Sequence, residues 1–155
     1  MKQQNLLPST FVLERSYPAP PDRVFAAFAD PTKRIRWSFE GEHHKLEHCE
    51  MDFRTGGLER VDMRMGPNTP IANMLITRDA RYQYIENDRC IIMASTMSLE
   101  GRIMSASLET FELLPTETGT DLIFTHHAMF FEHSDGPEMR KGGWSRMLDE
   151  LSSQL

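Results

Sequence analysis

Cysteine is scarce in this sequence, and the two that occur form none of the common cysteine motifs. Cys49 and Cys90 lie far apart without a CxxC pair, so neither a zinc knuckle nor a thioredoxin-type redox site is indicated. We expect both residues to be reduced, buried and structural. The histidines lack the HExxH spacing of zinc enzymes, so we expect neither a metal nor another cofactor.

Apolar runs long enough to span a membrane are also missing. No stretch approaches the ~18 consecutive apolar residues of a membrane-spanning helix. Residues 1–8 lack the apolar segment of a secretory signal peptide. These two absences predict a cytoplasmic protein without a membrane span.

Positive charge is in short supply. The chain has 17 Lys and Arg against 23 Asp and Glu, a net charge of −6. Nucleic acid is therefore not expected as a partner, because phosphate binding depends on a basic patch. The one basic cluster, residues 33–36, is expected to lie on a solvated helix face. The GxSxG, GxxxxGKS/T and GxGxxG motifs are absent as well, which leaves nucleophilic catalysis and nucleotide binding without support.

The length of the chain predicts a single domain. A chain of 155 residues is that of a single ordinary domain. A domain of this size buries roughly 70% of its unfolded surface, so it needs neither a disulfide nor a metal to fold. We expect an N-terminal extension over residues 1–9 and a single domain over residues 10–155.

Turn residues divide the chain into a strand, two short helices, six strands and a long helix. Alternating apolar residues predict the first strand over residues 10–17, and the prolines that follow end it and start a helix. Asp30 as N-cap and Pro31 at the first helical position start a second helix, which ends near Trp37. The further strands are expected over residues 45–54, 58–65, 71–85, 90–99, 103–114 and 121–131. Their hairpin-length connections predict an antiparallel meander.

The last segment has the pattern of an amphipathic helix. Asp135 and Glu138 have the spacing of a capping box around Pro137. An apolar stripe follows at helical period: Trp144, Met147, Leu148, Leu151 and Leu155. Gly142 and Gly143 conflict with a helix here, and close backbone approach, room beneath the helix or fraying would each explain them. A lone helix with one apolar stripe needs a curled sheet to cover it, which predicts an α+β fold.

Local motifs in a fixed order add a family resemblance. They are Tyr17-Pro18-Ala19-Pro20 with Val24-Phe25, Asp30-Pro31 to Arg36-Trp37, Asp52-Phe53-Arg54-Thr55-Gly56-Gly57, Thr125-His126-His127-Ala128-Met129-Phe130-Phe131, and Gly143-Trp144 with Leu148-Asp149-Glu150-Leu151. Over residues 10–155 the chain resembles the START-like (SRPBCC, polyketide-cyclase) superfamily, in the branch homologous to the C-terminal domain of the activator of the 90-kDa heat-shock-protein ATPase. The resemblance implies the helix-grip fold of the birch pollen allergen. In that fold a curved antiparallel seven-stranded sheet surrounds a long C-terminal helix, with two short helices after the first strand.

The resemblance also implies a function. A hydrophobic small molecule would be bound or sequestered in a cavity between the sheet and the C-terminal helix. Methionine-rich walls would suit such a ligand, because thioethers are flexible and apolar. The resemblance places Trp37 near the cavity mouth and Trp144 at the start of the helix, although core packing also explains both. The candidate cavity residues are Trp37, Met63, Met65, Tyr82, Met93, Phe111, His126, Trp144, Met147 and Leu148.

Among the candidate cavity residues, His126 is the one that can both form hydrogen bonds and transfer a proton near neutral pH. On the buried face of the last strand it would contact a ligand, act as a general base, or be a satisfied core residue. Four further residues are expected to add polar contacts: Arg81, Tyr82, Tyr84 and Glu109. Two other functions stay open, namely a cyclase- or hydrolase-type enzyme using His126 and a nearby carboxylate, and a co-chaperone-like protein-interaction module. We expect binding rather than catalysis, and a homodimer stays open.

Overall fold

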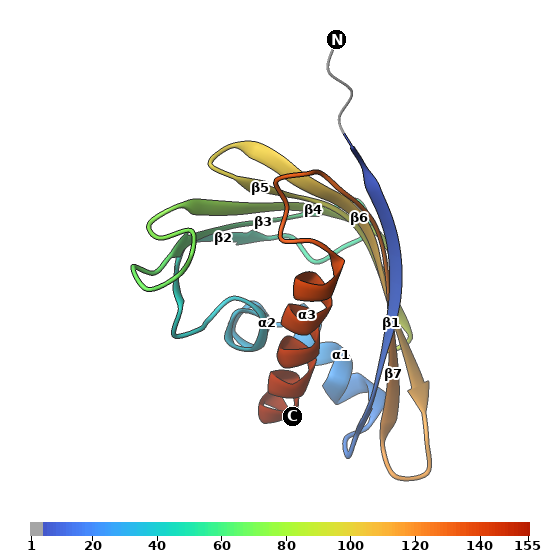
Figure 1. The fold of residues 1–155 in the computed structure, drawn as a ribbon. Helices are drawn as coiled ribbons and strands as arrows, with labels where there is room; N and C mark the ends of the chain where they lie inside the picture. The colour runs from blue at the N-terminus through green and yellow to red at the C-terminus, as the bar shows by residue number, and fades with distance from the viewer. Residues whose placement is uncertain (1–4) are drawn as a thin grey trace.

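Seven antiparallel strands form one curved sheet around a C-terminal helix (Figure 1). The structure is a computed structural model that describes residues 5–155. Its strands are β1 (Leu7–Tyr17), β2 (His44–Met51), β3 (Leu58–Met65), β4 (Leu75–Glu86), β5 (Cys90–Leu99), β6 (Arg102–Pro115) and β7 (Thr120–Phe130). The helices are α1 (Pro21–Ala29), α2 (Pro31–Ser38) and α3 (Pro137–Leu151), followed by a 3-10 turn, η1 (Ser152–Gln154).

The strand order explains where the helices lie. It runs β1-β7-β6-β5-β4-β3-β2, so consecutive hairpins join β2 to β7, and β1 pairs with β7 at one edge. Because β1 and β2 occupy opposite edges, α1 and α2 carry the chain from one edge to the other. All three helices lie on the concave side of the sheet (Figure 1). The predicted fold class is therefore confirmed.

Most predicted boundaries agree with the structure to within a few residues. The third and fifth strands were predicted over residues 58–65 and 90–99, the bounds of β3 and β5. β4 begins only at Leu75, because a turn with Asn73 at φ 62° precedes it. β1 begins at Leu7, inside the extension expected over residues 1–9, and residues 1–4 lie outside the described part of the chain.

One predicted helix cap is confirmed and the other is wrong. The Asp30 carboxylate accepts a hydrogen bond of 2.9 Å from the Thr32 amide, as an N-cap of α2 should. For α3 the N-cap is Gly136, without a side-chain hydrogen bond. The Asp135 carboxylate instead accepts two hydrogen bonds from Arg140, at 2.9 and 2.8 Å. A charge-assisted bidentate pair is stronger than a neutral cap contact, so Asp135 is drawn to the guanidinium.

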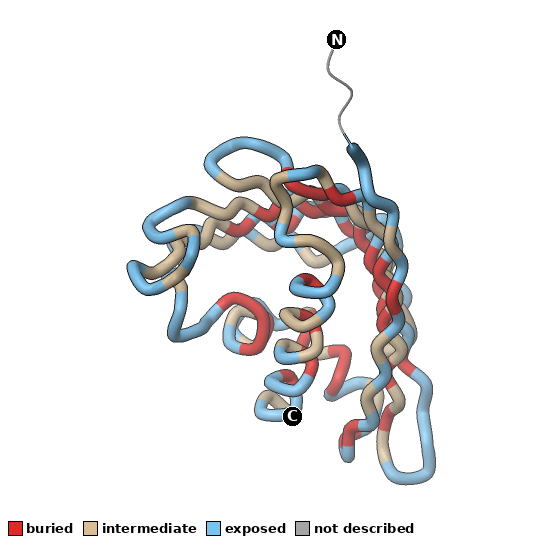
Figure 2. The backbone as a smooth tube through the Cα atoms, in the orientation of Figure 1, coloured by how far each residue is buried: buried red, intermediate tan, exposed pale blue. Residues whose placement is uncertain are grey.

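The apolar stripe of α3 packs against the sheet as predicted. Trp144, Leu148 and Leu151 are buried, and Met147 and Leu155 are partly buried against the same core. Tyr17 Oη donates a hydrogen bond of 2.6 Å to the Leu148 carbonyl, which ties the helix to β1. Figure 2 shows that buried residues concentrate where the sheet meets the three helices.

The two glycines of α3 lie within the helix and have room around them. A Cβ atom at Gly142 or Gly143 would meet only the end of the Arg146 side chain, at 3.7 or 4.0 Å. Both positions are helical. Close backbone approach is therefore the wrong explanation, and room beside the helix agrees with the structure.

Replacing either glycine of α3 with alanine should stabilise the fold. We expect Gly142→Ala and Gly143→Ala each to raise the free energy of unfolding by about 0.5–1 kcal/mol in urea titrations, because alanine loses less backbone entropy. Gly57→Ala is the opposing control, since its Cβ would overlap the Asp52 carbonyl oxygen. A loss of stability at either helical position would contradict the open surroundings of the pair.

Candidate functional site

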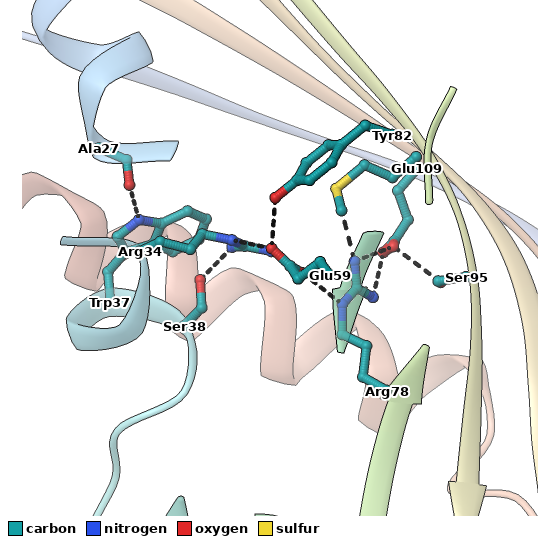
Figure 3. A network of polar contacts seen from close by, with 10 residues as sticks. Ala27, Arg34, Trp37, Ser38, Glu59, Arg78, Tyr82, Ser95 and Glu109 are labelled. Carbon is teal, nitrogen blue, oxygen red and sulfur yellow. Dashed lines mark hydrogen bonds and ion pairs between the residues drawn. The ribbon is translucent and has the colours of Figure 1, made fainter. Parts of the chain in front are cut away.

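A chain of four buried charges crosses the concave side of the sheet (Figure 3). Arg34 of α2 donates to both carboxylate oxygens of Glu59 on β3, each at 3.1 Å. Arg78 of β4 donates to Glu59 at 3.1 Å and to one oxygen of Glu109 on β6 at 2.9 Å, and a second nitrogen of its guanidinium lies 2.8 Å from the other Glu109 oxygen in an ion pair. All four side chains are at most 5% exposed. Positive and negative groups alternate, so the charges cancel.

Neutral groups complete this charged network. Tyr82 Oη donates to Glu59 at 2.9 Å, and Ser95 Oγ donates to Glu109 at 3.0 Å. Arg34 also donates to Ser38 Oγ, and its guanidinium lies 4.6 Å from the Trp37 ring centre. Every carboxylate and guanidinium of the network therefore has several partners.

The network keeps both carboxylates ionised. Burial alone would raise the pKa of Glu59, but the charges of Arg34 and Arg78 hold it at about 2. Burial likewise acts against ionisation of Glu109, and Arg78 lowers the pKa of that carboxyl below its usual range. A buried pair of this kind contributes little net stability, but removing one partner is costly.

Small side chains form a row across the concave face beside this network. Strand register aligns five residues, here called the small-residue row: Ala80, Ser95, Ser107, Ala128 and Ser9. Larger residues flank it on one side: Tyr82, Met93, Glu109, His126 and Phe11. On the other side stand Arg78, Met97, Ser105, Phe130 and Leu7. The Arg78–Glu109 pair spans the row at Ser95, so the row is free of that ion pair at Ser107 and Ala128.

His126 leans over the small-residue row. Its ring stacks on Phe11 at 4.6 Å and lies 6.3 Å from the Phe130 ring. Phe130 is four residues further along β7, about 13 Å at the rise of a strand, so the two rings lean toward each other over Ala128. His126 is 1% exposed.

Polar atoms without partners mark the same place. Within residues 5–155, neither ring nitrogen of His126 has a hydrogen-bond partner. The Ser105 Oγ atom is also buried without one. Leaving a buried polar group unpaired costs about 1–3 kcal/mol, so such groups call for an explanation.

His126 is neutral at pH 7. Burial lowers the pKa of its ring to about 4; the Glu109 carboxylate opposes this, and the charges of Arg140 and Arg78 add to it. A neutral imidazole has one N–H donor and one acceptor nitrogen. His126 can therefore offer a ligand one hydrogen bond of each kind.

The N-terminal half of α3 lies over this side of the sheet. The Trp144 ring is 4.5 Å from Phe124 and 5.9 Å from the Arg78 guanidinium. Arg140 lies 5.2 Å from the Phe130 ring. The Arg140–Asp135 ion pair, at 2.8 Å, links the helix to the segment of residues 131–136 that precedes it.

The predicted cavity residues lie in different surroundings in the structure. His126 carries two of the unpartnered atoms, and Trp144 is buried on α3 against Phe124. Met63 and Met65 are half-buried on the concave side of β3, and Met147 is partly buried on α3. Tyr82 belongs to the charged network. Four others are buried in the core: Trp37, Met93, Phe111 and Leu148. Trp37 donates its indole N–H to the Ala27 carbonyl at 2.8 Å, as a packed core tryptophan does.

Several sequence-based expectations need correction. Arg34 was expected on a solvated helix face, yet it is 1% exposed, because Glu59 draws it inward. Arg81 and Tyr84 are exposed rather than inward, while Glu109 is inward as expected. The two free cysteines, Cys49 and Cys90, are half-buried rather than buried.

Four buried polar residues of the site were not predicted from the sequence: Arg34, Glu59, Arg78 and Ser105. Strand alternation carried a usable signal for two of them. Glu59 shares its face of β3 with Val61, and Arg78 shares its face of β4 with Ala80, both of which are buried. Charges on an apolar face indicate a buried pair.

The surface depressions of the structure lie away from α3. One of about 550 Å³ is lined by outward residues such as Arg60, Asp79 and Thr96, together with three members of the small-residue row: Ala80, Ser95 and Ser107. Three others, of about 350, 560 and 520 Å³, lie by Pro8 and Met129, by the turn at Gly56, and by Asp22 and Asp88. None of these four depressions is lined by a residue of α3, so none is the cavity expected from the sequence.

In the part of the chain that the structure describes, no three His, Cys, Asp or Glu residues gather into a group able to hold a metal ion. Over the same residues, no helix combines the length and apolarity needed to cross a membrane. His44 makes a hydrogen bond of 2.8 Å with the Phe39 carbonyl.

The curved sheet around α3, with α1 and α2 inserted after β1, defines a helix-grip domain of the SRPBCC type. Its seven-stranded order and C-terminal helix are those of this class. The chain belongs to the family described as Activator of Hsp90 ATPase homolog 1-like protein, which matches residues 18–155. This fold family commonly binds hydrophobic ligands.

Solved structures agree with the family assignment. The Mll3558 protein from Rhizobium loti is 36% identical, with a TM-score of 0.86 over 97% of this chain and 99% of that chain. A protein from Rhizobium leguminosarum is 30% identical, with a TM-score of 0.89 over 99% and 97%. An AHSA1-like protein from Aeromonas hydrophila, 15% identical, shares the fold with a TM-score of 0.66 over 94% and 91%. No curated protein matches this chain.

Proposed function

We propose that this protein binds a small, mainly apolar molecule on the concave face of the sheet, over Ser107 and Ala128 and under the N-terminal half of α3. The observation that carries the proposal is the group of unpartnered atoms at this place, the two ring nitrogens of His126 and the Ser105 Oγ. A bound molecule would supply the hydrogen bonds that the protein leaves unmade. Its binding would recover part of the cost of burying those groups.

The surroundings suit an apolar body with few polar atoms. Phe130 and Trp144 supply apolar rings on this side of the sheet, and the side chains of Ser107 and Ala128 beneath them are small. Half-buried Met63 and Met65 continue the concave face along β3 and adapt easily to a ligand, because thioethers are flexible. Apolar walls with a small number of polar groups are typical of ligand sites.

Access would require the start of α3 and the segment 131–136 to move. The Asp135–Arg140 ion pair holds that segment to the helix, and Gly136, at φ 85°, forms the joint between them. Gly142 and Gly143 lower the helical stability of the same half of α3. We therefore expect the N-terminal half of α3 to move away from the sheet more easily than the C-terminal half.

Binding fits the site better than acid–base catalysis does. Glu109 lies directly opposite His126 across β6 and β7, so the carboxylate required by the enzyme alternative is nearby. One of its oxygens, however, accepts a hydrogen bond from Arg78, and the other accepts from Ser95 and lies 2.8 Å from Arg78 in an ion pair. With these contacts in place, Glu109 pairs with Arg78, and no hydrogen bond joins it to His126.

A fluorescent probe tests the proposal. We expect N-phenyl-1-naphthylamine, a neutral apolar dye, to bind the full chain with increased emission. Ala128→Leu should weaken this binding about tenfold or more, since its larger side chain would project into the position proposed for the ligand. Ala106→Leu is the matched control, because Ala106 is exposed on the convex side of the neighbouring strand.

A second variant keeps the test independent of folding. Ser107→Val adds less volume than Ala128→Leu at the neighbouring position of the row, and circular dichroism verifies that each variant is folded. Weaker dye binding in both concave variants, with the Ala106→Leu variant unchanged, supports the proposal. No dye binding by the unmodified chain, or equal affinities in all folded variants, would overturn it.

A further inference from the structure

We infer that the bound molecule is uncharged and places a hydroxyl group, or an equivalent group that both donates and accepts, against His126. This inference rests on the proposed function and narrows its ligand to one chemical class. It excludes carboxylates, phosphates and ammonium compounds as the group that reaches His126.

The buried charges around the site balance one another. Three buried arginines lie on the concave side of the sheet, and each already has an acidic partner: Arg34 with Glu59, Arg78 with Glu59 and Glu109, and Arg140 with Asp135. Three cations thus face three carboxylates, at distances of 2.8–3.1 Å. Among these groups none is left over to neutralise a charged ligand.

Replacing one partner of a buried ion pair with a charged ligand costs free energy. A ligand carboxylate that took the place of Glu109 at Arg78 would displace a carboxylate that is only 1% exposed. The displaced carboxylate would then be buried without a counter-charge, which is strongly unfavourable. An ammonium group would strand an arginine in the same way. A neutral group avoids both penalties, because it leaves every pair intact.

The His126 ring offers a ligand both kinds of hydrogen bond. The protein fixes neither tautomer of His126, since both ring nitrogens lack protein partners within residues 5–155. Burial keeps the ring neutral. A hydroxyl group donates to the bare nitrogen or accepts from the N–H, so it suits either tautomer. The Ser105 hydroxyl supplies another donor and acceptor on the opposite flank of the small-residue row.

Four naphthalene derivatives separate charge from hydrogen bonding. Their affinities are measured at pH 7.5 by displacement of N-phenyl-1-naphthylamine: naphthalene, 2-naphthol, 2-naphthoate and 2-naphthylmethylammonium. We expect 2-naphthol to bind about tenfold tighter than naphthalene, because it satisfies a buried group. Each ion should bind at least about tenfold more weakly than 2-naphthol. An ion that binds as tightly as 2-naphthol would overturn the inference.

Two histidine variants test whether His126 causes the preference for 2-naphthol over naphthalene. In His126→Phe the ratio of naphthol to naphthalene affinity should fall from about tenfold to about one, since phenylalanine offers no hydrogen bond. In His127→Phe the ratio should stay near tenfold, because His127 is exposed on the convex face and bonds to Thr10. A ratio that survives in His126→Phe would overturn the inference. Failure of all four compounds to bind would instead contradict the proposed function itself.

Discussion

Replacing Arg78 with methionine should lower the free energy of unfolding by about 3–5 kcal/mol, because it leaves buried carboxylates without their cation. Arg78 is the link between Glu59 and Glu109, and both glutamates are at most 1% exposed. Methionine keeps much of the side-chain volume, so the loss reports on charge rather than on a cavity. Urea denaturation at pH 7 measures it.

A surface arginine of the neighbouring strand provides the control for Arg78→Met. Arg60 pairs with Asp79 at 3.3 Å, with both side chains half exposed, so Arg60→Met should change stability by less than ~1 kcal/mol. Adding Glu109→Gln to Arg78→Met should restore part of the lost stability, since one of the stranded charges is then removed. Equal losses in Arg78→Met and Arg60→Met would contradict the buried network.

Lowering the pH from 7 to 4 should cost about 3 kcal/mol of stability through His126 alone. Burial lowers its pKa from 6.5 to about 4 in the folded protein, so between these values the unfolded chain binds a proton that the folded chain does not. Stability therefore falls as the pH falls through this window. The difference of 2.5 pKa units corresponds to roughly 3 kcal/mol at 1.36 kcal/mol per unit.

Two variants isolate the His126 contribution. His126→Phe should flatten the stability profile between pH 4 and 6.5, while His127→Phe should keep the slope of the unmodified chain. The charged groups that act on His126 are Glu109, Arg140, Arg78 and Asp135, and all remain in both variants. Glu59, whose pKa is about 2, adds a further loss only below its ordinary value of 4.5. Equal slopes in the two variants would contradict a buried neutral histidine.

The fold was largely predictable because its signals are local. Alternation along residues 58–65 and 90–99 gave the bounds of β3 and β5, and the Asp30-Pro31 pair marked the start of α2. The stripe from Trp144 to Leu155 identified the face of α3 that packs on the core. Each of these patterns depends on backbone periodicity or capping, which neighbouring residues decide.

The site was only partly predictable because it depends on contacts between distant segments. His126 was expected to be inward and is inward, since strand parity determines its side. Arg34 could not be placed from its own helix, where it sits in a basic run. Its partner Glu59 is 25 residues away, and only the packing of α2 on β3 brings them to 3.1 Å.

The sequence by itself determined the element order, the antiparallel pairing of successive strands and the family, because periodicity, turn residues and local motifs carry that information. Only the tertiary structure decided which charges are buried and which polar atoms are left unpaired. Burial of an ion pair depends on whether two groups from separate elements meet out of water. The same register brings Ser105, Ser107 and Ala128 beside His126, where side chains from β6 and β7 meet below α3.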